Sequence, residues 1–314
     1  MSKTKFIILI LFIINLNLIS CGKNKERQPK KNYTEIATNE ELQKLSQEIF
    51  ELDNTNILSK VHINYQGRFQ SHNSTDDLAP EPLLTYENEI TELDTIKHMM
   101  MMYDNYERNS SVDEIVTDDE RAEEKNFINS LLSTAVMKKT LNFLESKNLV
   151  GSSEDEQYTL LHSIWFGLYP RNKGTNATSS GFEHVFLSEI KKKKTIGLHN
   201  WIYFAMMEKT GELDYKGWMS RANLGDKAII LTIKLTINGY RKNISSIMIG
   251  TSPELEFALY TLCFKTRVNR KCPLSFNDTK FNINSYSLVH KKKKLVASAY
   301  AEIKENNFVE SESI

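Results

Sequence analysis

The chain has 314 residues, of which 40% are hydrophobic and 25% are charged. A chain of this length and composition can bury a hydrophobic core, which excludes a short peptide or a wholly polar, disordered protein. It suits one large domain or two small ones. The formal net charge is zero, but residues 22–150 carry 15 Lys and Arg against 24 Asp and Glu, whereas residues 151–314 carry 23 against 16. The basic C-terminal half suits an anionic partner such as a chain of phosphates, although the opposite charges also allow the two halves to attract each other.

Residues 1–22 are predicted to be a signal peptide that is not part of the fold. Lys3 and Lys5 precede an apolar run from 6 to 19, and small residues follow at 20–22. This run is short for a membrane span and polar residues follow it, so we expect a secreted protein with no membrane span. The same segment also matches a bacterial lipobox, which leaves lipid anchoring through Cys21 as the alternative.

Cysteine usage agrees with export. Apart from Cys21, the chain has only Cys263 and Cys272, which stand close together in the sequence. In an oxidising compartment a disulfide between them is expected, with two reduced core thiols as the alternative. Six N-glycosylation sequons are compatible with secretion, and they begin at Asn32, Asn73, Asn109, Asn176, Asn243 and Asn277.

The next part of the chain is predicted to be mainly helical. Residues 23–38 are polar and are expected to form a disordered linker. Apolar residues at helical spacing then predict a helix from Asn39, with Asn39 as its cap, and a short strand candidate follows at 61–65. Further helices are predicted over 96–106, from a Thr117 cap, over 127–144 and over 158–168.

After residue 178 the pattern changes to β-branched runs separated by turn residues. Residues 228–237 predict a strong strand, Asn238-Gly239 a hairpin turn, and residues 244–249 the returning strand. A short helix is predicted over 253–264, and a final strand pair over 280–289 and 294–303. Residues 304–314 form a polar tail. The order of elements therefore indicates an α+β fold.

Three features of the basic half suggest chemistry. His184 and His199 stand fifteen residues apart among aromatic residues, and a pair of imidazoles can remove one proton and deliver another in a single reaction. Lys242 lies on the returning side of the predicted hairpin, where an ammonium can stabilise charge on a phosphoryl group. Together they suit acid–base cleavage of a phosphodiester, although two buried structural histidines are the simpler interpretation of the pair alone.

Four ordered motifs strengthen the chemical interpretation. They resemble the signature of the EndoU family of poly(U)-specific endoribonucleases, and the likeness extends over residues 39–303. The motifs are Ser180-Gly181-Phe182-Glu183-His184-Val185-Phe186, Gly197-Leu198-His199-Asn200-Trp201-Ile202, Asp214-Tyr215-Lys216-Gly217 and Gly250-Thr251-Ser252-Pro253-Glu254-Leu255-Glu256-Phe257-Ala258-Leu259-Tyr260.

The resemblance implies a helical N-terminal half, residues 39–178, and a catalytic β-rich half, residues 179–303, with two antiparallel sheets. It also implies an RNA lyase reaction on single-stranded RNA at uridylates, which leaves a 2′,3′-cyclic phosphate and a 5′-hydroxyl. Mn²⁺, or Ca²⁺, is implied as an activator, with no known ligands. The implied site residues are His184 as acid, His199 as base, the catalytic Lys242, the substrate-binding Ser246 and Tyr286, and the supporting acidic residues Glu183 and Glu189.

Two other functions remain open. One is an extracellular protein that binds RNA or another polyanion and whose nuclease centre is idle. The other is a hydrolase in which Glu183, His184, Glu189 and His199 are metal ligands. We expect a monomer, and the lysine runs at 191–194 and 291–294 are candidates for phosphate contacts to RNA, with solvated loops as the alternative.

Overall fold

The computed structural model describes residues 35–303 except 72 and 173. The predicted signal peptide, most of the predicted linker and the polar tail lie outside these residues. Residues 35–303 belong to one compact unit, which contains both the helical and the β-rich parts. None of the helices in the described part is long and apolar enough to span a membrane.

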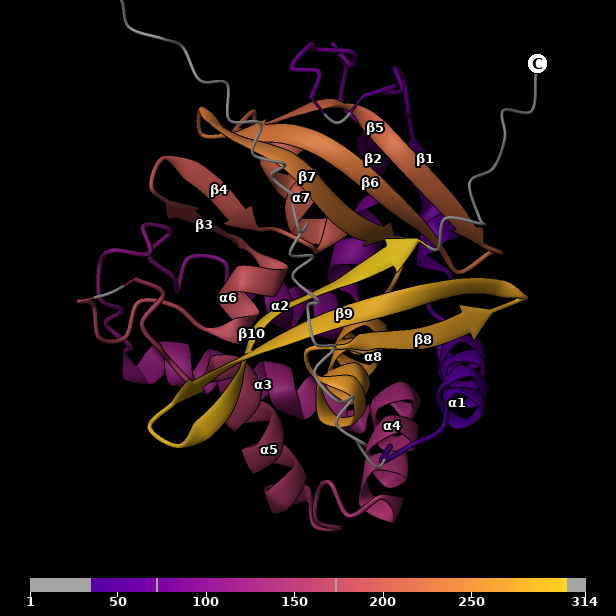
Figure 1. The fold of residues 1–314 in the computed structure, drawn as a ribbon, viewed down its shortest axis with the longest axis vertical. Helices are drawn as coiled ribbons and strands as arrows, with labels where there is room; N and C mark the ends of the chain where they lie inside the picture. The colour runs from indigo at the N-terminus through magenta and orange to yellow at the C-terminus, as the bar shows by residue number, and fades with distance from the viewer. Residues whose placement is uncertain (1–34, 72, 173, 304–314) are drawn as a thin grey trace, which may run out of the picture. The chain divides into compact units, whose positions relative to one another are not determined.

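The first part of the described chain is mainly helical (Figure 1). Its first helix is capped by Thr38 rather than by Asn39, because Thr38 and Glu41 form a reciprocal capping box. The long helix predicted over 127–144 is divided at Thr134, whose hydroxyl accepts from Met137 N and starts a new helix. The helices are α1 (Asn39–Leu52), α2 (Asp94–Met101), α3 (Asp118–Ser133), α4 (Ala135–Ser146) and α5 (Glu154–Phe166), with 3₁₀ turns at Ile57–Lys60 and Asn88–Glu92.

The second part contains two three-stranded antiparallel sheets, as expected, and the α+β fold class is confirmed. One sheet has the order β5-β6-β7 and the other β10-β9-β8 (Figure 1). Two small antiparallel pairs, β1–β2 and β3–β4, were not predicted as pairs, although β1 falls within the strand candidate at 61–65. The strands are β1 (Val61–Ile63), β2 (Leu84–Tyr86), β3 (Ser188–Lys191), β4 (Lys194–Gly197), β5 (Leu213–Leu224), β6 (Ala228–Ile237), β7 (Tyr240–Ile249), β8 (Lys271–Phe276), β9 (Thr279–His290) and β10 (Lys293–Ile303).

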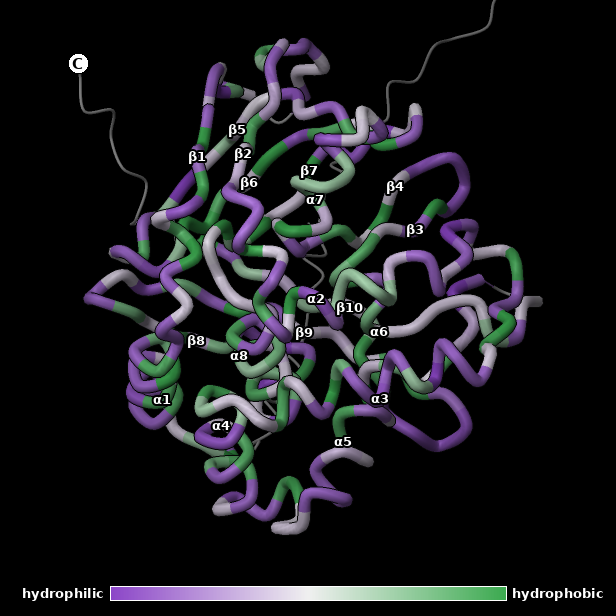
Figure 2. Tube along the Cα trace, turned by 180° about the vertical axis from the view of Figure 1, so that it is seen from behind, coloured by the Kyte–Doolittle hydropathy of each residue, from purple (hydrophilic) through white to green (hydrophobic). Residues whose placement is uncertain are grey.

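Three helices connect these strands: α6 (Gly181–Phe186), α7 (Trp201–Lys209) and α8 (Pro253–Arg267). An aromatic cluster packs α6 and α8 against the first part of the chain. Phe257 lies 5.3 Å from Phe127 and 4.6 Å from Trp165 between ring centroids, and Phe182 lies 5.1 Å from Phe166. Figure 2 shows hydrophobic residues gathered along these inner elements and hydrophilic residues at the β3–β4 turn. The core is therefore continuous across both parts.

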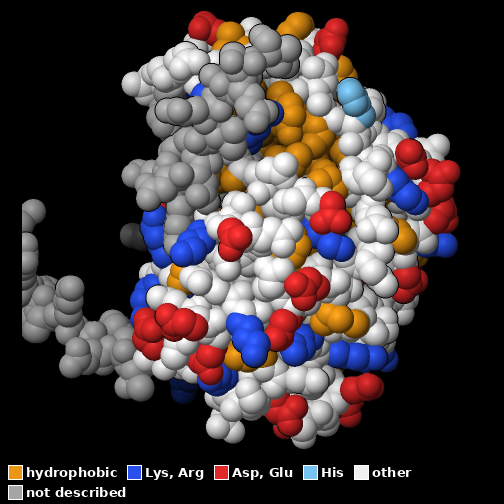
Figure 3. Space-filling model, turned by 90° about the vertical axis from the view of Figure 1, so that its right-hand side faces the viewer, with side chains coloured by type: hydrophobic (Ala, Val, Ile, Leu, Met, Phe, Trp, Pro, Cys, Tyr) orange, Lys and Arg blue, Asp and Glu red, His pale blue; other side chains and the backbone are white. Residues whose placement is uncertain are grey.

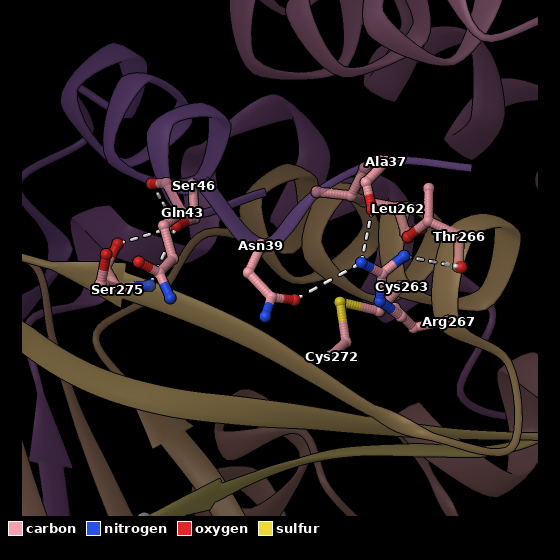
Figure 4. Close-up of a disulfide and its surroundings, with 10 residues drawn as sticks. All are labelled: Ala37, Asn39, Gln43, Ser46, Leu262, Cys263, Thr266, Arg267, Cys272 and Ser275. Carbon is pink, nitrogen blue, oxygen red and sulfur yellow. Dashed lines mark hydrogen bonds between the residues drawn. A yellow bond between two sulfur atoms is a disulfide. The ribbon is translucent and has the colours of Figure 1, made fainter. Parts of the chain in front are cut away.

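A disulfide joins Cys263 on α8 to Cys272 on β8, as the sequence predicts (Figure 4). Arg267 lies beside it, almost fully buried, and donates to the carbonyl of Ala37 ahead of α1. Ser46 on α1 completes the attachment, because its hydroxyl donates to the carbonyl of Ser275 at 2.8 Å. These contacts fix the N-terminal helix to the sheet that ends in β10.

Candidate active site

His184 lies on α6, and its imidazole is held by a buried carboxylate. Ser180 caps this short helix by accepting from Glu183 N at 3.0 Å. The Nδ1 atom of His184 is hydrogen-bonded to Oε2 of Glu189 on β3, and Glu189 has no exposed surface. A carboxylate only accepts, so Nδ1 carries the hydrogen and Nε2 is left free for chemistry. Burial, with the charge of Arg171, lowers the pKa of His184 to about 4.

Arg171 anchors Glu189 from the other side. Its Nη2 lies 3.1 Å from Glu189 Oε2 and 2.6 Å from the hydroxyl of Tyr169. Burial alone raises the pKa of Glu189, but the hydrogen bond from His184 and the charge of Arg171 lower that pKa overall. Glu189 is therefore an ionised carboxylate placed against one imidazole.

His199 is brought to the same place by backbone contacts between α6 and the start of α7. Leu198 N donates to His184 O at 3.0 Å, and His199 N donates to Val185 O at 2.8 Å. The Nδ1–H of His199 donates to the carbonyl of Ser246 at 3.0 Å, so its Nε2 is a free proton acceptor. Burial and the charge of Lys242 hold the pKa of His199 well below its usual value, which keeps the ring neutral.

The two imidazoles face one another across a cavity of about 490 Å³. Their ring centroids are 6.4 Å apart, and the ring of Tyr300 stacks on His199 at 5.1 Å. The structure thus brings together two segments that the sequence could only place fifteen residues apart. The cavity is lined by Arg171, His184, Lys191, Ile196, Gly197, His199, Lys242, Ile244, Ser245, Ser246, Ser298 and Tyr300.

Lys242 and Ser246 reach this cavity from β7, and a bulge lies between them. Leu235 of β6 pairs with Lys242 and Ile233 pairs with Ser245, so two residues of β7 oppose one residue of β6. Burial lowers the pKa of Lys242 to about 8, so its side chain is mainly an ammonium at neutral pH. The hydroxyl oxygen of Ser246 is buried without a hydrogen-bond partner among the described residues, which leaves it available to a ligand.

Tyr286 does not line the cavity. It lies on β9 with 44% of its surface exposed and stacks on Tyr300 at 6.2 Å. Tyr300 is the tyrosine whose ring reaches His199, and the sequence interpretation missed it, together with Arg171 and Ser298. The alternation of side chains along the predicted final strand places Ser298 and Tyr300 on one face, but the sequence does not say which face meets the histidines.

Glu183 and Glu189 have different environments although both are fully buried. Glu183 does not line the cavity, and neither of its carboxyl oxygens has a hydrogen-bond partner among the described residues. Burial and the charge of Glu189 raise the pKa of Glu183 well above its usual value. Burial thus disfavours the ionised form of Glu183 on α6, whereas Glu189 is held by the imidazole of His184 and by Arg171.

The donor set of the cavity does not fit a divalent cation. The described residues contain no group of three or more His, Cys, Asp or Glu that could hold a metal ion. Glu189 is already bound to His184 and Arg171, and the positive charges of Arg171 and Lys242 adjoin the two imidazoles. A hydrolase with Glu183, His184, Glu189 and His199 as metal ligands therefore does not fit, and we assign no step to Mn²⁺ or Ca²⁺.

Comparisons with known proteins agree with this geometry. The chain is 39% identical over 276 residues to a bovine protein named uridylate-specific endoribonuclease, covering 85% of this chain and 66% of that protein. It is 31% identical to uridylate-specific endoribonuclease D of Xenopus laevis, covering 93% of this chain and 98% of that protein.

A solved structure described as XendoU, a splicing-independent snoRNA processing endoribonuclease, superposes with a TM-score of 0.72 at 30% identity. The superposition covers 86% of this chain and all of that one. A sequence model of the family described as endoribonuclease XendoU matches residues 41–301. The chain belongs to the XendoU endoribonuclease family, the EndoU family that its four motifs resemble.

Proposed function

We propose that this protein is an endoribonuclease that cleaves single-stranded RNA at uridylates. The observation that carries the proposal is the pair of imidazoles with free Nε2 atoms facing one cavity beside the ammonium of Lys242. The names of the relatives supply the uridylate preference.

The reaction is a transesterification within the RNA. His199 Nε2 takes the proton of a ribose 2′-hydroxyl, and the 2′-oxygen attacks the adjacent phosphorus. The bond from phosphorus to the 5′-oxygen breaks, and His184 delivers a proton to that oxygen. The products are a 2′,3′-cyclic phosphate and a 5′-hydroxyl.

The hydrogen-bond partners of the two histidines support this division of roles. His184 contacts the ionised Glu189, which stabilises an imidazolium, whereas His199 contacts only a neutral carbonyl through its Nδ1. A bound phosphodiester adds negative charge and therefore raises the pKa of both rings. Because only His184 also contacts a carboxylate, His184 is protonated first. His184 is then the acid and His199 the base.

The other groups in the cavity act on the phosphate and the base. Lys242 and Arg171 place positive charge where the phosphoryl oxygens gain negative charge. The ring of Tyr300 offers a stacking surface, and the unpaired hydroxyl of Ser246 offers a hydrogen bond to a pyrimidine edge. Stimulation by Mn²⁺ or Ca²⁺ is part of the proposal, through RNA binding or conformation rather than at the histidine pair.

The test is cleavage of an oligonucleotide with one uridine, followed by end-group analysis. We expect cleavage after the uridine, with the cyclic phosphate on the upstream product and no cleavage when that uridine is 2′-deoxy. His184→Ala and His199→Ala should each reduce kcat by about 10²–10⁴. His98→Ala, a change on the partly exposed face of α2, is the matched control and should leave kcat unchanged.

Cleavage of the deoxy substrate would overturn the mechanism. Intact RNA after long incubation, with binding retained, would favour the idle RNA-binding protein. Assays in EDTA and with added Mn²⁺ separate an activator from an essential metal.

A further inference from the structure

Two hairpins beside the cavity turn on pairs of lysines in a left-handed backbone conformation. Lys192 and Lys193 join β3 to β4 with φ of 50° and 60°. Lys291 and Lys292 join β9 to β10 with φ of 46° and 65°. We call these pairs the two lysine turns. Positive φ at both central residues is the geometry of a type I′ turn, which favours Asn, Asp and Gly and disfavours a lysine side chain.

Other two-residue hairpin turns of the same chain use the favoured residues. Asn238-Gly239 joins β6 to β7 with φ of 49° and 79°, and Asn277-Asp278 joins β8 to β9 with φ of 45° and 64°. Turn geometry therefore explains Asn238-Gly239 and Asn277-Asp278 but not the two lysine turns. Residues held in an unfavourable backbone conformation point to a function for their side chains.

The strands that carry the lysine turns also line the cavity. Lys191, Ile196 and Gly197 contribute to it from the β3–β4 hairpin, and Ser298 and Tyr300 contribute from β10. Lys292 lies six residues from Ser298 along β10, about 20 Å at the rise of a strand. In Figure 1 both hairpins extend toward the left of the view, above and below α6.

The charges of the lysine turns are exposed and are not neutralised nearby. All four side chains are exposed, and within the described part of the chain none of them forms an ion pair. On the opposite face of the molecule, Lys and Arg side chains are interspersed with Asp and Glu (Figure 3). Lysines without an ion pair, on hairpins whose strands line the cavity, suit a polyanion that extends beyond the cavity.

We propose that the two lysine turns bind the backbone phosphates of single-stranded RNA on either side of the nucleotide in the cavity. This proposal rests on the proposed function and extends it from the cleaved bond to a longer strand. The lysines increase affinity for long RNA without reading its sequence, because phosphate contacts carry no base information.

The experiment exchanges each lysine turn for the turn that the fold itself uses between β6 and β7. The variants are Lys192→Asn with Lys193→Gly, Lys291→Asn with Lys292→Gly, and all four changes together. The matched control for each double variant is Lys125→Gln with Lys138→Gln, two exposed lysines on α3 and α4 that form no ion pair within the described residues and lose the same charge. The favoured turn residues should leave the melting temperature equal or higher, so lost binding cannot be attributed to unfolding.

Binding is measured with a long 2′-O-methyl oligouridylate, which cannot be cleaved, over a range of potassium chloride concentrations. We expect each turn exchange to weaken binding and to make the plot of log K against log salt shallower by about 0.7 for each lysine in contact. Cleavage of a uridine dinucleotide, which fills the cavity without extending along the hairpins, should keep its kcat/KM.

Unchanged affinity and salt slope in the four-lysine variant, or the same losses in the control, would overturn the proposal. So would a loss of binding to anionic phospholipid vesicles with RNA binding intact, which would assign the turns to a membrane surface. If the wild-type protein cleaves no RNA, the proposed function fails independently of this proposal. Binding of the 2′-O-methyl strand then still shows whether the lysine turns contact RNA.

Discussion

The ammonium of Lys242 gives the candidate site a pH signature. Its pKa is lowered to about 8, and the charged form exists below that value. If the ammonium stabilises the phosphoryl oxygens, kcat/KM on a uridine substrate should fall as pH rises through about 8. The Lys242→Arg variant keeps its positive charge at all these pH values. The fall in its kcat/KM should therefore move to higher pH, even if the variant is slower than the wild type. If kcat/KM of the arginine variant falls at the same pH as that of the wild type, another group titrates.

Glu256 on α8 is a buried acid that fixes the segment next to His199. Thr251 Oγ1 lies 2.7 Å from the carbonyl of Met248 and 2.8 Å from Glu256 Oε1, and its single hydrogen can serve only one of them. A protonated Glu256 satisfies both contacts by donating to Thr251, while its other oxygen accepts from Asn200 Nδ2 at 3.0 Å. Burial raises the pKa of Glu256 to about 8, which agrees with this arrangement.

Glu256→Gln should therefore change the pH dependence of stability. The pKa of the wild-type carboxyl is raised on folding. Its contribution to the free energy of unfolding is therefore fully present below about pH 4.5, and it is lost by roughly 1.4 kcal/mol per pH unit as pH rises toward about 8. Glutamine keeps the donor and the acceptor but does not titrate. Thermal melts should show that the stability of the variant relative to the wild type increases between pH 5 and pH 8. A difference in melting temperature that stays constant with pH would contradict a protonated Glu256.

At the level of elements, the site depends on how closely β4 approaches α6. Gly197 ends β4 with φ of 73°, and a Cβ built there would lie 2.0 Å from the carbonyl oxygen of His184. The segments that carry the two histidines are thus in backbone contact. A side chain at this position has to separate them.

Gly197→Ala should destabilise the fold and remove activity, whereas Gly239→Ala should not affect activity. Gly239 has a similar φ of 79°, but a Cβ added there would have no neighbouring atom within 4 Å. Its substitution carries only the backbone cost, about 1–2 kcal/mol. Urea unfolding and kcat measure both changes, and equal losses in the two variants would contradict a special role for the contact at Gly197.

The predicted elements succeeded where the pattern is regular. Residues 228–237 were predicted as a strand and form β6 with the same bounds, because β-branched and other apolar residues run there without a turn residue. β5 was missed because two bulges interrupt its alternation. β8 was missed because it is short and contains Pro273, and β3–β4 because four lysines conceal the strand pattern.

At the scale of the whole molecule, the helical and β-rich parts share one core. Phe127 and Trp165 from the first part pack on Phe257 of α8, and Trp165 Nε1 donates to Thr261 Oγ1 at 2.9 Å. We predict that residues 179–303 expressed alone do not fold, because these aromatic faces would be exposed. Circular dichroism should show no cooperative unfolding transition for the fragment. A cooperative transition would establish two independent domains.

The sequence by itself determined the family and the α+β class, and it predicted three groups that the structure brings to one cavity: His184, His199 and Lys242. These follow from local patterns and ordered motifs, which are properties of neighbouring residues. The tertiary structure decided that Tyr300 stacks on His199 while Tyr286 lies outside the cavity, that Arg171 anchors Glu189, and that burial raises the pKa of Glu183. Strand register, burial and contacts between distant segments set these properties, and no local pattern in the chain encodes them.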